Sequence, residues 1–367
     1  MHHQRTNRHT QASGARGRPS SGVRLSAVIM VPVLITLTVL TLLTAGCRGE
    51  KQDGEFKVAV FVPGFTEGSP IYEMLAAGAR EAVEDDPLAS AEVVEGGYNQ
   101  ALWQEKVTSL AATGSYDLIL TSNPAMPAVC AEVARDFPDQ AFAVMDGYLA
   151  DHPQIYTVLF NQVEQAYLIG YLAGLVTTGA MPGANPRAGV GMIVGQQYPV
   201  MDRAIRPGFE RGLREAAPSA ELDFRVVGNW HDAGKAAELA QSMFDAGIDV
   251  VLPIAGGAGL GVLKVAEENG RYVLWFDSSG YSLAPGTVVG STVLKNDRAA
   301  RETVELAMEG KLPLGEARVV GVEQGYIDFV DDDPLYERHV PETIRREMQR
   351  VLDRFSSGEL SLSMPEL

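Results

Sequence analysis

The chain has 367 residues, of which 46% are hydrophobic and 21% charged, and its formal net charge is −17. This apolar fraction is typical of a globular protein and excludes disorder for most of the length. The first 46 residues hold five arginines and no acidic residue, so the remaining 321 carry a net charge of −22. Such an acidic body repels nucleic-acid phosphates and does not suit a polybasic membrane-surface protein, so no nucleic-acid partner is expected.

Length and cysteine count limit the architecture further. A body of 321 residues is too long for one comfortable core and predicts about two lobes. The cysteines are Cys47 and Cys130, which excludes a disulfide framework and a cysteine-rich metal site. Cys130 lies on the apolar face of a predicted helix, so we expect an inert buried thiol there.

The N-terminal segment has the features of a secretory signal. An arginine-rich stretch is followed by the uncharged apolar run 25–43 and by small residues directly before Cys47. This order resembles a bacterial lipobox, although Thr44 stands where that motif usually has leucine. The resemblance predicts removal of residues 1–46, lipidation of Cys47 and a tether over residues 47–56. The alternative is an uncleaved anchor, because the apolar run approaches the ~20 residues that span a bilayer.

Beyond the leader, apolar runs alternate with helical patterns. The run 56–62 (FKVAVFV) predicts a buried parallel strand that ends in a loop at Pro63-Gly64. Gly170 and Gly174 in a later helix predict close packing against a neighbour. The first series has strands at 56–62, 91–94, 117–121, 141–145 and 155–160, and helices at 72–84, 101–113, 127–136 and 164–177.

A second series repeats this alternation. Strands that alternate with helices predict parallel sheets and the α/β class, and two such series predict two similar doubly wound lobes. Residues 357–367 are expected to form a loose tail. The second series has strands at 188–194, 223–227, 249–253, 272–276 and 287–293, and helices at 201–216, 234–246, 259–269, 298–309 and 341–355.

Open α/β sheets bind ligands beyond the carboxyl ends of their strands. The residues at those positions are mostly polar, aromatic or glycine, which predicts a cleft for a small neutral polyol or heterocycle. They are Pro63-Gly64-Phe65, Ser122-Asn123, Asp146-Gly147-Tyr148, Gly195-Gln196-Gln197-Tyr198, Asn229-Trp230-His231-Asp232, Ala255-Gly256-Gly257 and Asp277-Ser278-Ser279.

Several stretches carry a family resemblance, in the same order along the chain. They are FAVMDG (142–147), EQAYLIGYLAG (164–174), PVMDRAIRPGFERG (199–212), VGNWHDAGK (227–235), AGGAGLG (255–261), residues 276–278 with 283–285, and STVLK (291–295). Together they resemble the basic membrane protein family of bacterial lipoproteins, the purine-nucleoside-type solute-binding components of importers. The resemblance implies a type I periplasmic-binding fold, in which two lobes are joined by a hinge of three crossings and close on the ligand.

The same resemblance implies domain limits and partners. The first lobe would contain 57–160 and about 284–320, and the second 161–283 and about 321–356. The implied function is a lipid-anchored, extracytoplasmic binding protein that delivers a small polar ligand, a purine nucleoside, to a membrane permease and its ATPase. No cofactor is implied, and the protein would be a monomer.

Site residues follow by position within these stretches. The resemblance implies that Asp146 bonds the base edge or the sugar, and that Asp277 accepts hydrogen bonds from two ribose hydroxyls. Gly256 and Gly257 would let the backbone approach the ligand, while Lys295 would donate to the sugar or hold Asp277. The further expected ligand-binding residues are Tyr72, Asn123, Tyr198 and Trp230.

The first lobe departs from the family pattern. Its usual strand-end aspartate is replaced by Val62-Pro63, and a Ser-Phe-Asn run that binds the base is replaced by Pro70-Ile71-Tyr72. Isoleucine cannot stack on a purine, so the ring face is expected from Tyr72, Phe65, Trp103 or Trp230. Recognition of the sugar is therefore implied more fully than recognition of the base.

Each of these residues also has a structural alternative. Asp146 and Asp277 could cap helices or form turns. Gly256-Gly257 could be a tight turn, Lys295 a solvated surface lysine, and the aromatic residues of the second lobe core or hinge packing.

Two other functions are compatible with the residues. A nucleoside-cleaving hydrolase could use Asp146 and Asp277 as a carboxylate pair. However, His152, His231 and His339 lack metal-ligand spacing and no Gly-x-Ser-x-Gly motif occurs, so neither an enzyme nor a metal site is expected. A ligand-sensing lipoprotein receptor that signals through a partner would need the same closing cleft as a transport protein.

Overall fold

The computed structural model describes residues 54–179, 181–185 and 188–366. The expected signal segment 1–46, Cys47 and most of the expected tether lie outside these residues. Along the described residues, no helix combines the length and the apolar composition needed to cross a membrane.

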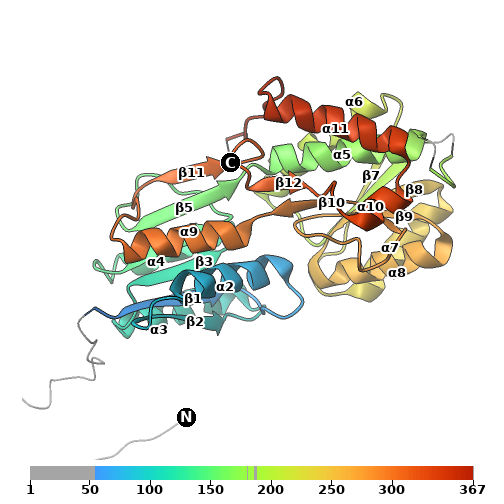
Figure 1. Ribbon diagram of the computed structural model, residues 1–367. Helices are drawn as coiled ribbons and strands as arrows, with labels where there is room; N and C mark the ends of the chain where they lie inside the picture. Colours follow the sequence, from blue (N-terminus) through green and yellow to red (C-terminus); the bar gives the residue numbers. More distant parts are fainter. Residues whose placement is uncertain (1–53, 180, 186–187, 367) are drawn as a thin grey trace, which may run out of the picture. The chain divides into compact units, whose positions relative to one another are not determined.

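Two six-stranded sheets organise the described chain (Figure 1). The first sheet contains β1 (Phe56–Val62), β2 (Ala89–Glu95), β3 (Leu118–Ser122), β4 (Ala141–Met145), β5 (Ile155–Phe160) and β11 (Ala317–Val320). Its order is β2-β1-β3-β4-β5-β11, and all neighbouring strands are parallel. β3 and β5 are buried along their whole length, which explains why their sequences are continuous apolar runs rather than alternating ones.

Helices cover both faces of this sheet and form lobe 1 with it. They are α2 (Pro70–Val83), α3 (Trp103–Ala112) with a 3₁₀ turn η1 (Gln100–Leu102) before it, α4 (Met126–Ala134) and α9 (Asn296–Met308). α2 and α9 pack together on one face, and α3 and α4 on the other. Alternate residues of β1 serve the two cores: Val58 and Val60 pack toward α2 and α9, whereas Ala59 and Phe61 pack toward α3 and α4.

The second sheet repeats the topology of the first. It contains β6 (Gly189–Val194), β7 (Glu221–Val226), β8 (Ile248–Ile254), β9 (Tyr272–Trp275), β10 (Val288–Leu294) and β12 (Ile327–Phe329). Its order is β7-β6-β8-β9-β10-β12, parallel except for β12, which runs antiparallel to β10. In both sheets the strand order reverses beside the first strand, the place at which open α/β sheets bind ligands. The expected α/β class with two doubly wound lobes is therefore confirmed.

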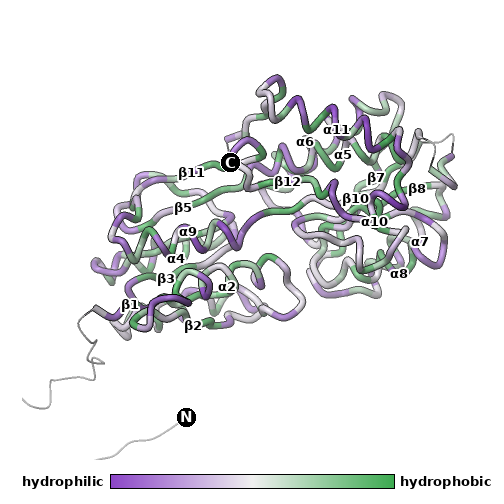
Figure 2. The backbone as a smooth tube through the Cα atoms, in the orientation of Figure 1, coloured by the Kyte–Doolittle hydropathy of each residue, from purple (hydrophilic) through white to green (hydrophobic). Residues whose placement is uncertain are grey.

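Helices also sandwich the second sheet and form lobe 2 with it. They are α5 (Gln162–Thr178), a π-helical turn η2 (Met201–Ile205), α6 (Arg206–Ala216), α7 (Ala233–Asp245), a 3₁₀ turn η3 (Gly256–Ala258), α8 (Gly259–Asn269), α10 (Pro334–His339) and α11 (Glu342–Ser356). α5 contacts both α6 and α11, while α7 and α8 pack together (Figure 1). Figure 2 shows β5 and β8 mostly in the hydrophobic colour, whereas α11 alternates between the two colours because one of its faces is buried.

α5 and α6 approach each other closely at glycines. A Cβ atom on Gly170 would lie 2.2 Å from the carbonyl oxygen of Phe209, and one on Gly212 would lie 2.1 Å from that of Tyr167. Gly174 similarly faces the Cβ of Ala216. The expectation that Gly170 and Gly174 allow close packing is confirmed, and the two backbones are in contact.

The described chain passes between the two sheets three times. It leaves the first sheet after Phe160, returns after Leu294 and leaves again after Val320. Because β10 pairs with β9, the apolar run near residue 290 belongs to lobe 2. The expected lobe boundary at residues 283 and 284 is thereby corrected to about residue 295.

The C-terminal segment is not a loose tail, which corrects the expectation for residues 357–367. Leu360 and Leu362 are 7% and 3% exposed and belong to the core of lobe 2. The side-chain nitrogen of Asn161, at the first crossing, donates a hydrogen bond to the carbonyl oxygen of Leu362 over 2.6 Å. Apolar burial and this bond together hold the segment against the hinge.

The close approach of α5 and α6 predicts the effect of a single methyl group. Gly170→Ala should lower the free energy of unfolding by about 1–3 kcal/mol, the usual effect of overpacking a tight core. Urea denaturation followed by circular dichroism measures this change. Gly234→Ala is the matched control, because Gly234 is exposed in the first turn of α7 and has no neighbour closer than 3.5 Å to its Cβ position. An equal loss in both variants would contradict the packing explanation.

Candidate functional site

Residues that follow β1, β3 and β4 meet at one end of lobe 1. Tyr72 lies in the first turn of α2, Asn123 follows β3 and Asp146 follows β4. The Asn123 side-chain nitrogen donates to the Tyr72 hydroxyl over 3.4 Å, and that hydroxyl donates to the carbonyl oxygen of Pro63 over 3.3 Å. Burial raises the pKa of Tyr72 to about 12, while the bond from Asn123 lowers it and the charge of Asp146 raises it. The phenol therefore remains a neutral hydrogen-bonding group.

Three of the expected site residues other than glycine have a left-handed backbone. The φ angles are 133° at Asn123, 52° at Asp146 and 69° at Asp277. Asparagine and aspartate tolerate this region better than other residues with a side chain. Such conformations gather at binding and active sites, although they also occur in plain turns. The backbone of the turns after β3, β4 and β9 is therefore by itself a reason for asparagine or aspartate at these positions, in addition to any contact with a ligand.

In lobe 2 the residues after β6, β7 and β8 pack on one another. The ring of Trp230 covers Gly195, where a Cβ atom would lie 2.5 Å from the indole. The centroids of the Trp230 and Tyr198 rings are 6.1 Å apart. Gly256 has a φ of 54° and Gly257 follows it in the exposed turn η3, next to the carbonyl oxygen of Trp230. The expected aromatic and glycine residues of this lobe are thus neighbours.

Asp146 and Asp277 belong to opposite lobes and act on each other electrostatically. Burial, with a smaller contribution from the charge of Asp277, raises the pKa of Asp146 to about 8. The pKa of Asp277 is raised to about 6, because the effect of burial exceeds the opposite effect of a hydrogen bond from Gln165. Burial and then the charges of these two carboxyls raise the pKa of Tyr198 well above its usual value. Side chains from both lobes therefore share one electrostatic environment.

Asp146 also has an unused hydrogen-bond acceptor. Its Oδ1 atom is buried and has no hydrogen-bond partner among the described residues. A buried acceptor without a donor costs about 1–3 kcal/mol. A hydroxyl or amino group of a ligand that donates to this oxygen would remove that cost.

In the structure Lys295 does not hold Asp277 and Trp103 is buried, whereas a bond from Lys295 to a ligand stays a prediction. The Lys295 ammonium pairs with the Asp328 carboxylate over 3.3 Å, and both side chains are largely exposed. The side chain bonded to Asp277 is instead that of Gln165, over 3.1 Å. Trp103 is 3% exposed and packs in the core of lobe 1, so it offers no ring face to a ligand. Gln165 was missed because nothing in the sequence marks a glutamine in an apolar helix as a partner of Asp277.

A chain of rings connects the lobes at the edge strands. Phe65 and Tyr98 of lobe 1 meet edge to face with centroids 4.9 Å apart. Tyr98 in turn stacks on His231 of lobe 2, with centroids 5.6 Å apart and an interplanar angle of 28°. Tyr98 is 61% exposed, so this contact lies at the surface. It is a second place, besides the two carboxyls, where lobes 1 and 2 interact.

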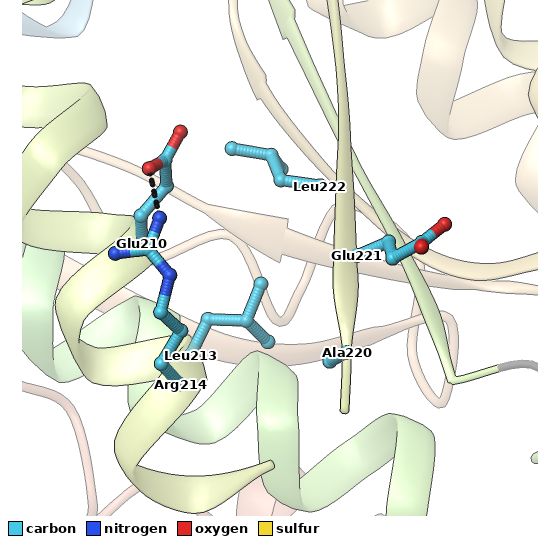
Figure 3. A pocket seen from close by; sticks show the side chains of 6 residues that line it. All are labelled: Glu210, Leu213, Arg214, Ala220, Glu221 and Leu222. Carbon is cyan, nitrogen blue, oxygen red and sulfur yellow. Dashed lines mark hydrogen bonds and ion pairs between the residues drawn. The ribbon is translucent and has the colours of Figure 1, made fainter. Parts of the chain in front are cut away.

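A surface hollow elsewhere on lobe 2 shares no residue with this site. Figure 3 shows side chains of α6 and of the start of β7 around it, with an ion pair between Glu210 and Arg214. Its lining is otherwise aliphatic, apart from Glu221. Among the described residues, no group of three His, Cys, Asp or Glu side chains is placed to hold a metal ion.

Solved structures with a similar fold include solute-binding proteins. A solute-binding protein of an ABC transporter from Aeropyrum pernix K1 matches with a TM-score of 0.75 and 19% identity, over 85% of this chain and 94% of that one. A solute-binding protein from Bacillus halodurans C-125 with bound myo-inositol matches with a TM-score of 0.59 and 12% identity, over 79% and 99%. At these identities the likeness shows the fold, which is that of periplasmic-type solute-binding proteins.

The sequence gives the narrower assignment. Residues 56–361 match the Bmp family, described as "ABC transporter substrate-binding protein PnrA-like", and the chain belongs to this family. The expected relationship to basic membrane proteins is thus confirmed. The family consists of substrate-binding proteins of ABC transporters rather than enzymes. Such proteins work outside the cytoplasm with a small-molecule ligand, a permease and an ATPase.

Curated relatives have low sequence identity to this chain but match it over more than half of its length. Basic membrane protein A of Borreliella burgdorferi is 24% identical over 337 residues, which cover 89% of this chain and 93% of the relative. The ABC transporter nucleoside-binding protein BmpA of Lactococcus lactis subsp. cremoris is 25% identical over 221 residues, 56% of this chain and 60% of the relative. The CD4+ T-cell-stimulating antigen of Listeria monocytogenes is 24% identical over 259 residues, 66% and 70%.

The buried carboxyl of Asp146 predicts a pH-dependent stability difference. Asp146→Asn should raise the melting temperature of the ligand-free protein, and the gain should grow as pH rises from about 4 to about 8. The folded-state pKa of about 8 lies above the ordinary 3.8. The wild type therefore has the full stability of its protonated carboxyl below the ordinary pKa and loses it as pH rises through the folded pKa. Asparagine keeps the left-handed backbone and does not ionise.

Scanning calorimetry at a series of pH values tests this prediction. Asp151→Asn is the matched control, since Asp151 has a φ of 62° but an exposed side chain. It should leave the melting temperature unchanged throughout. A gain for Asp146→Asn that does not vary with pH would show that the carboxyl is not buried as described.

Proposed function

We propose that this chain is the lipid-anchored binding component of an ATP-driven importer and that it binds a purine nucleoside between lobes 1 and 2. The observation that carries the ligand proposal is the Asp146–Asp277 pair. One carboxyl comes from each lobe, and Oδ1 of Asp146 is buried without a donor. A ligand that donates hydrogen bonds to both carboxyls would join the lobes and stabilise their closed arrangement by its differential affinity.

The chemistry of the pair suits a sugar. An ionised carboxylate only accepts hydrogen bonds and offers about four lone-pair sites, so it can take both hydroxyls of a vicinal diol. One oxygen of Asp277 already accepts from Gln165, which leaves the other for such a diol. The nucleoside-binding relative from Lactococcus lactis supports the same class of ligand. In this proposal Asp277 binds the ribose, and Asp146 binds the base edge or the sugar.

The base would find its ring face among the remaining aromatic residues. Tyr72 lies beside Asn123 and Asp146 in lobe 1, while Tyr198 and Trp230 lie together in lobe 2. A purine between these side chains would have an aromatic neighbour from each lobe. The exposed backbone of Gly256 and Gly257 would approach the ligand from the end of β8.

Binding measurements test the ligand and the role of Asp277 together. Adenosine or inosine should bind and be recovered intact, whereas adenosine 5′-phosphate should bind far more weakly because its charge approaches two carboxyls. Asp277→Asn should weaken adenosine binding at least about tenfold, since hydrogen bonds to charged groups contribute ~1.5–3 kcal/mol. Asparagine is chosen because the φ of 69° at this position would strain alanine. Isothermal titration calorimetry gives the dissociation constants.

Two outcomes would contradict this proposal. Thermal-shift hits confined to free sugars or amino acids would exclude a nucleoside ligand. An unchanged dissociation constant for Asp277→Asn would exclude the assigned role of the carboxylate. Asp151→Asn, which changes an exposed aspartate with a similar backbone, should bind adenosine like the wild type.

The anchor proposal concerns Cys47. Its place after an apolar run and small residues supports processing of residues 1–46 and lipidation of the new N-terminus. Two or more acyl chains on one cysteine are enough for stable membrane attachment. The acidic, folded body would then be tethered outside the cytoplasm, where substrate-binding proteins operate.

Substitution of that cysteine gives a direct test. In a bacterial host, the full chain should fractionate with membranes, and mass spectrometry should find acyl groups on Cys47. Cys47→Ser should abolish the acyl groups and block cleavage of the leader, while Cys130→Ser should change neither. Acylation absent from the wild-type protein would refute the anchor.

A further inference from the structure

Gln165 is a buried polar residue next to the hinge. It lies in the first turn of α5, which begins directly after the first crossing between the lobes, and it is 0% exposed. Its Nε2 atom donates to Oδ1 of Asp277 over 3.1 Å and to the Thr292 hydroxyl over 3.3 Å. Both hydrogens of this amide nitrogen therefore form hydrogen bonds, one of them to a carboxylate that is proposed to bind the ligand.

The orientation of the Gln165 amide is set by that carboxylate. Reversing the amide would place Oε1 against Oδ1 of Asp277, two acceptors facing each other. In the observed orientation Oε1 is buried and has no hydrogen-bond partner among the described residues. An apolar side chain of the same shape would avoid this cost. Packing alone therefore does not account for a glutamine at this position, whereas its bond to Asp277 does.

The surroundings of Gln165 connect it to the crossings. The neighbouring Glu164 accepts a hydrogen bond from the backbone nitrogen of Val322, on the third crossing, over 2.9 Å. Thr292 lies near the end of β10, just before the second crossing. The residue next to Gln165 is thus bonded to the third crossing, and the Gln165 amide is bonded to the strand that leads into the second.

We propose that Gln165 is the positioning residue of Asp277: it fixes one carboxylate oxygen so that the other faces the ligand. This inference rests on the proposed role of Asp277 in binding. The groups that face Asp277 are Asp146, Tyr198 and Gln165, while the Lys295 ammonium pairs with Asp328. The bond from Gln165 also keeps Asp277 ionised at neutral pH, because it lowers a pKa that burial raises.

Gln165→Met tests the proposal, because methionine keeps the length and shape of glutamine but cannot donate. Adenosine binding at neutral pH should weaken at least about tenfold. The melting temperature of the ligand-free protein should fall at neutral pH but stay equal or rise below the ordinary pKa of 3.8, where Asp277 is protonated with or without the bond. Binding should be lost as the pH is lowered and Asp277 becomes protonated. The midpoint of this loss should lie at a higher pH in Gln165→Met than in the wild type, because the pKa of Asp277 would be higher. Thr292→Val is the matched control: it removes the other acceptor of Nε2, leaves the bond to Asp277 and should change affinity less than about threefold.

A titration of Asp277 by carbon-13 NMR gives a measurement that needs no ligand. Its midpoint, expected at about 6 in the wild type, should rise in Gln165→Met and stay in place in Thr292→Val. An unmoved midpoint would overturn the positioning role whatever the affinities are. Equal weakening by Gln165→Met in the wild type and in Asp277→Asn would also overturn it, because the glutamine would then act independently of Asp277.

The same variants separate this inference from the function on which it rests. If Asp277→Asn binds adenosine as well as the wild type does, the proposed binding role of Asp277 fails. If Asp277→Asn binds weakly but Gln165→Met binds normally, only the positioning role fails.

Discussion

The geometry of the whole binding region depends on how the three crossings are held together. The backbone nitrogen of Asn161, on the first, donates to the carbonyl oxygen of Val320 on the third over 2.7 Å. The nitrogen of Lys295, on the second, donates to the carbonyl oxygen of Tyr326 over 2.9 Å. Each connecting segment is therefore bonded to another. Because the hinge joins lobes 1 and 2, rotation there would change the distance between Asp146 and Asp277.

The proposed binding region contains two carboxyls, Asp146 and Asp277, and the nearby Lys295 ammonium pairs with Asp328 rather than with either of them. The charge of Asp277 in one lobe adds to the cost of ionising Asp146 in the other, and a glutamine amide, rather than a lysine, donates a hydrogen bond to Asp277. Without a donor-rich ligand, this arrangement favours a proton on Asp146 or separation of the lobes. In the proposed binding mode, the ligand and the proton would compete for the Asp146 carboxyl. Affinity and lobe closure would then depend on pH through that competition, with the tyrosines as neutral neighbours.

The sequence predicted the regular parts of the fold because their pattern is strong. The limits of β1, β4 and β5 were predicted to the residue, since each is a continuous apolar run bounded by polar or turn residues. β11 and β12 were missed because they are short edge strands with exposed residues, such as Val319, and no periodicity. Asp146 and Asp277 could be found from strand ends and the family resemblance. Gln165 could not, because its contact with Asp277 spans distant parts of the sequence.

The packed C-terminal segment offers a position for a fluorescent label beside the hinge. Ser361 is exposed between the buried Leu360 and Leu362, beside the first crossing. A fluorophore attached there through a new cysteine would lie beside the hinge. Cys130 would not compete for the dye, because it is fully buried and burial raises the pKa of its thiol. An affinity tag fused after this segment could disturb its packing against lobe 2. A tag for purification is therefore better placed before residue 54.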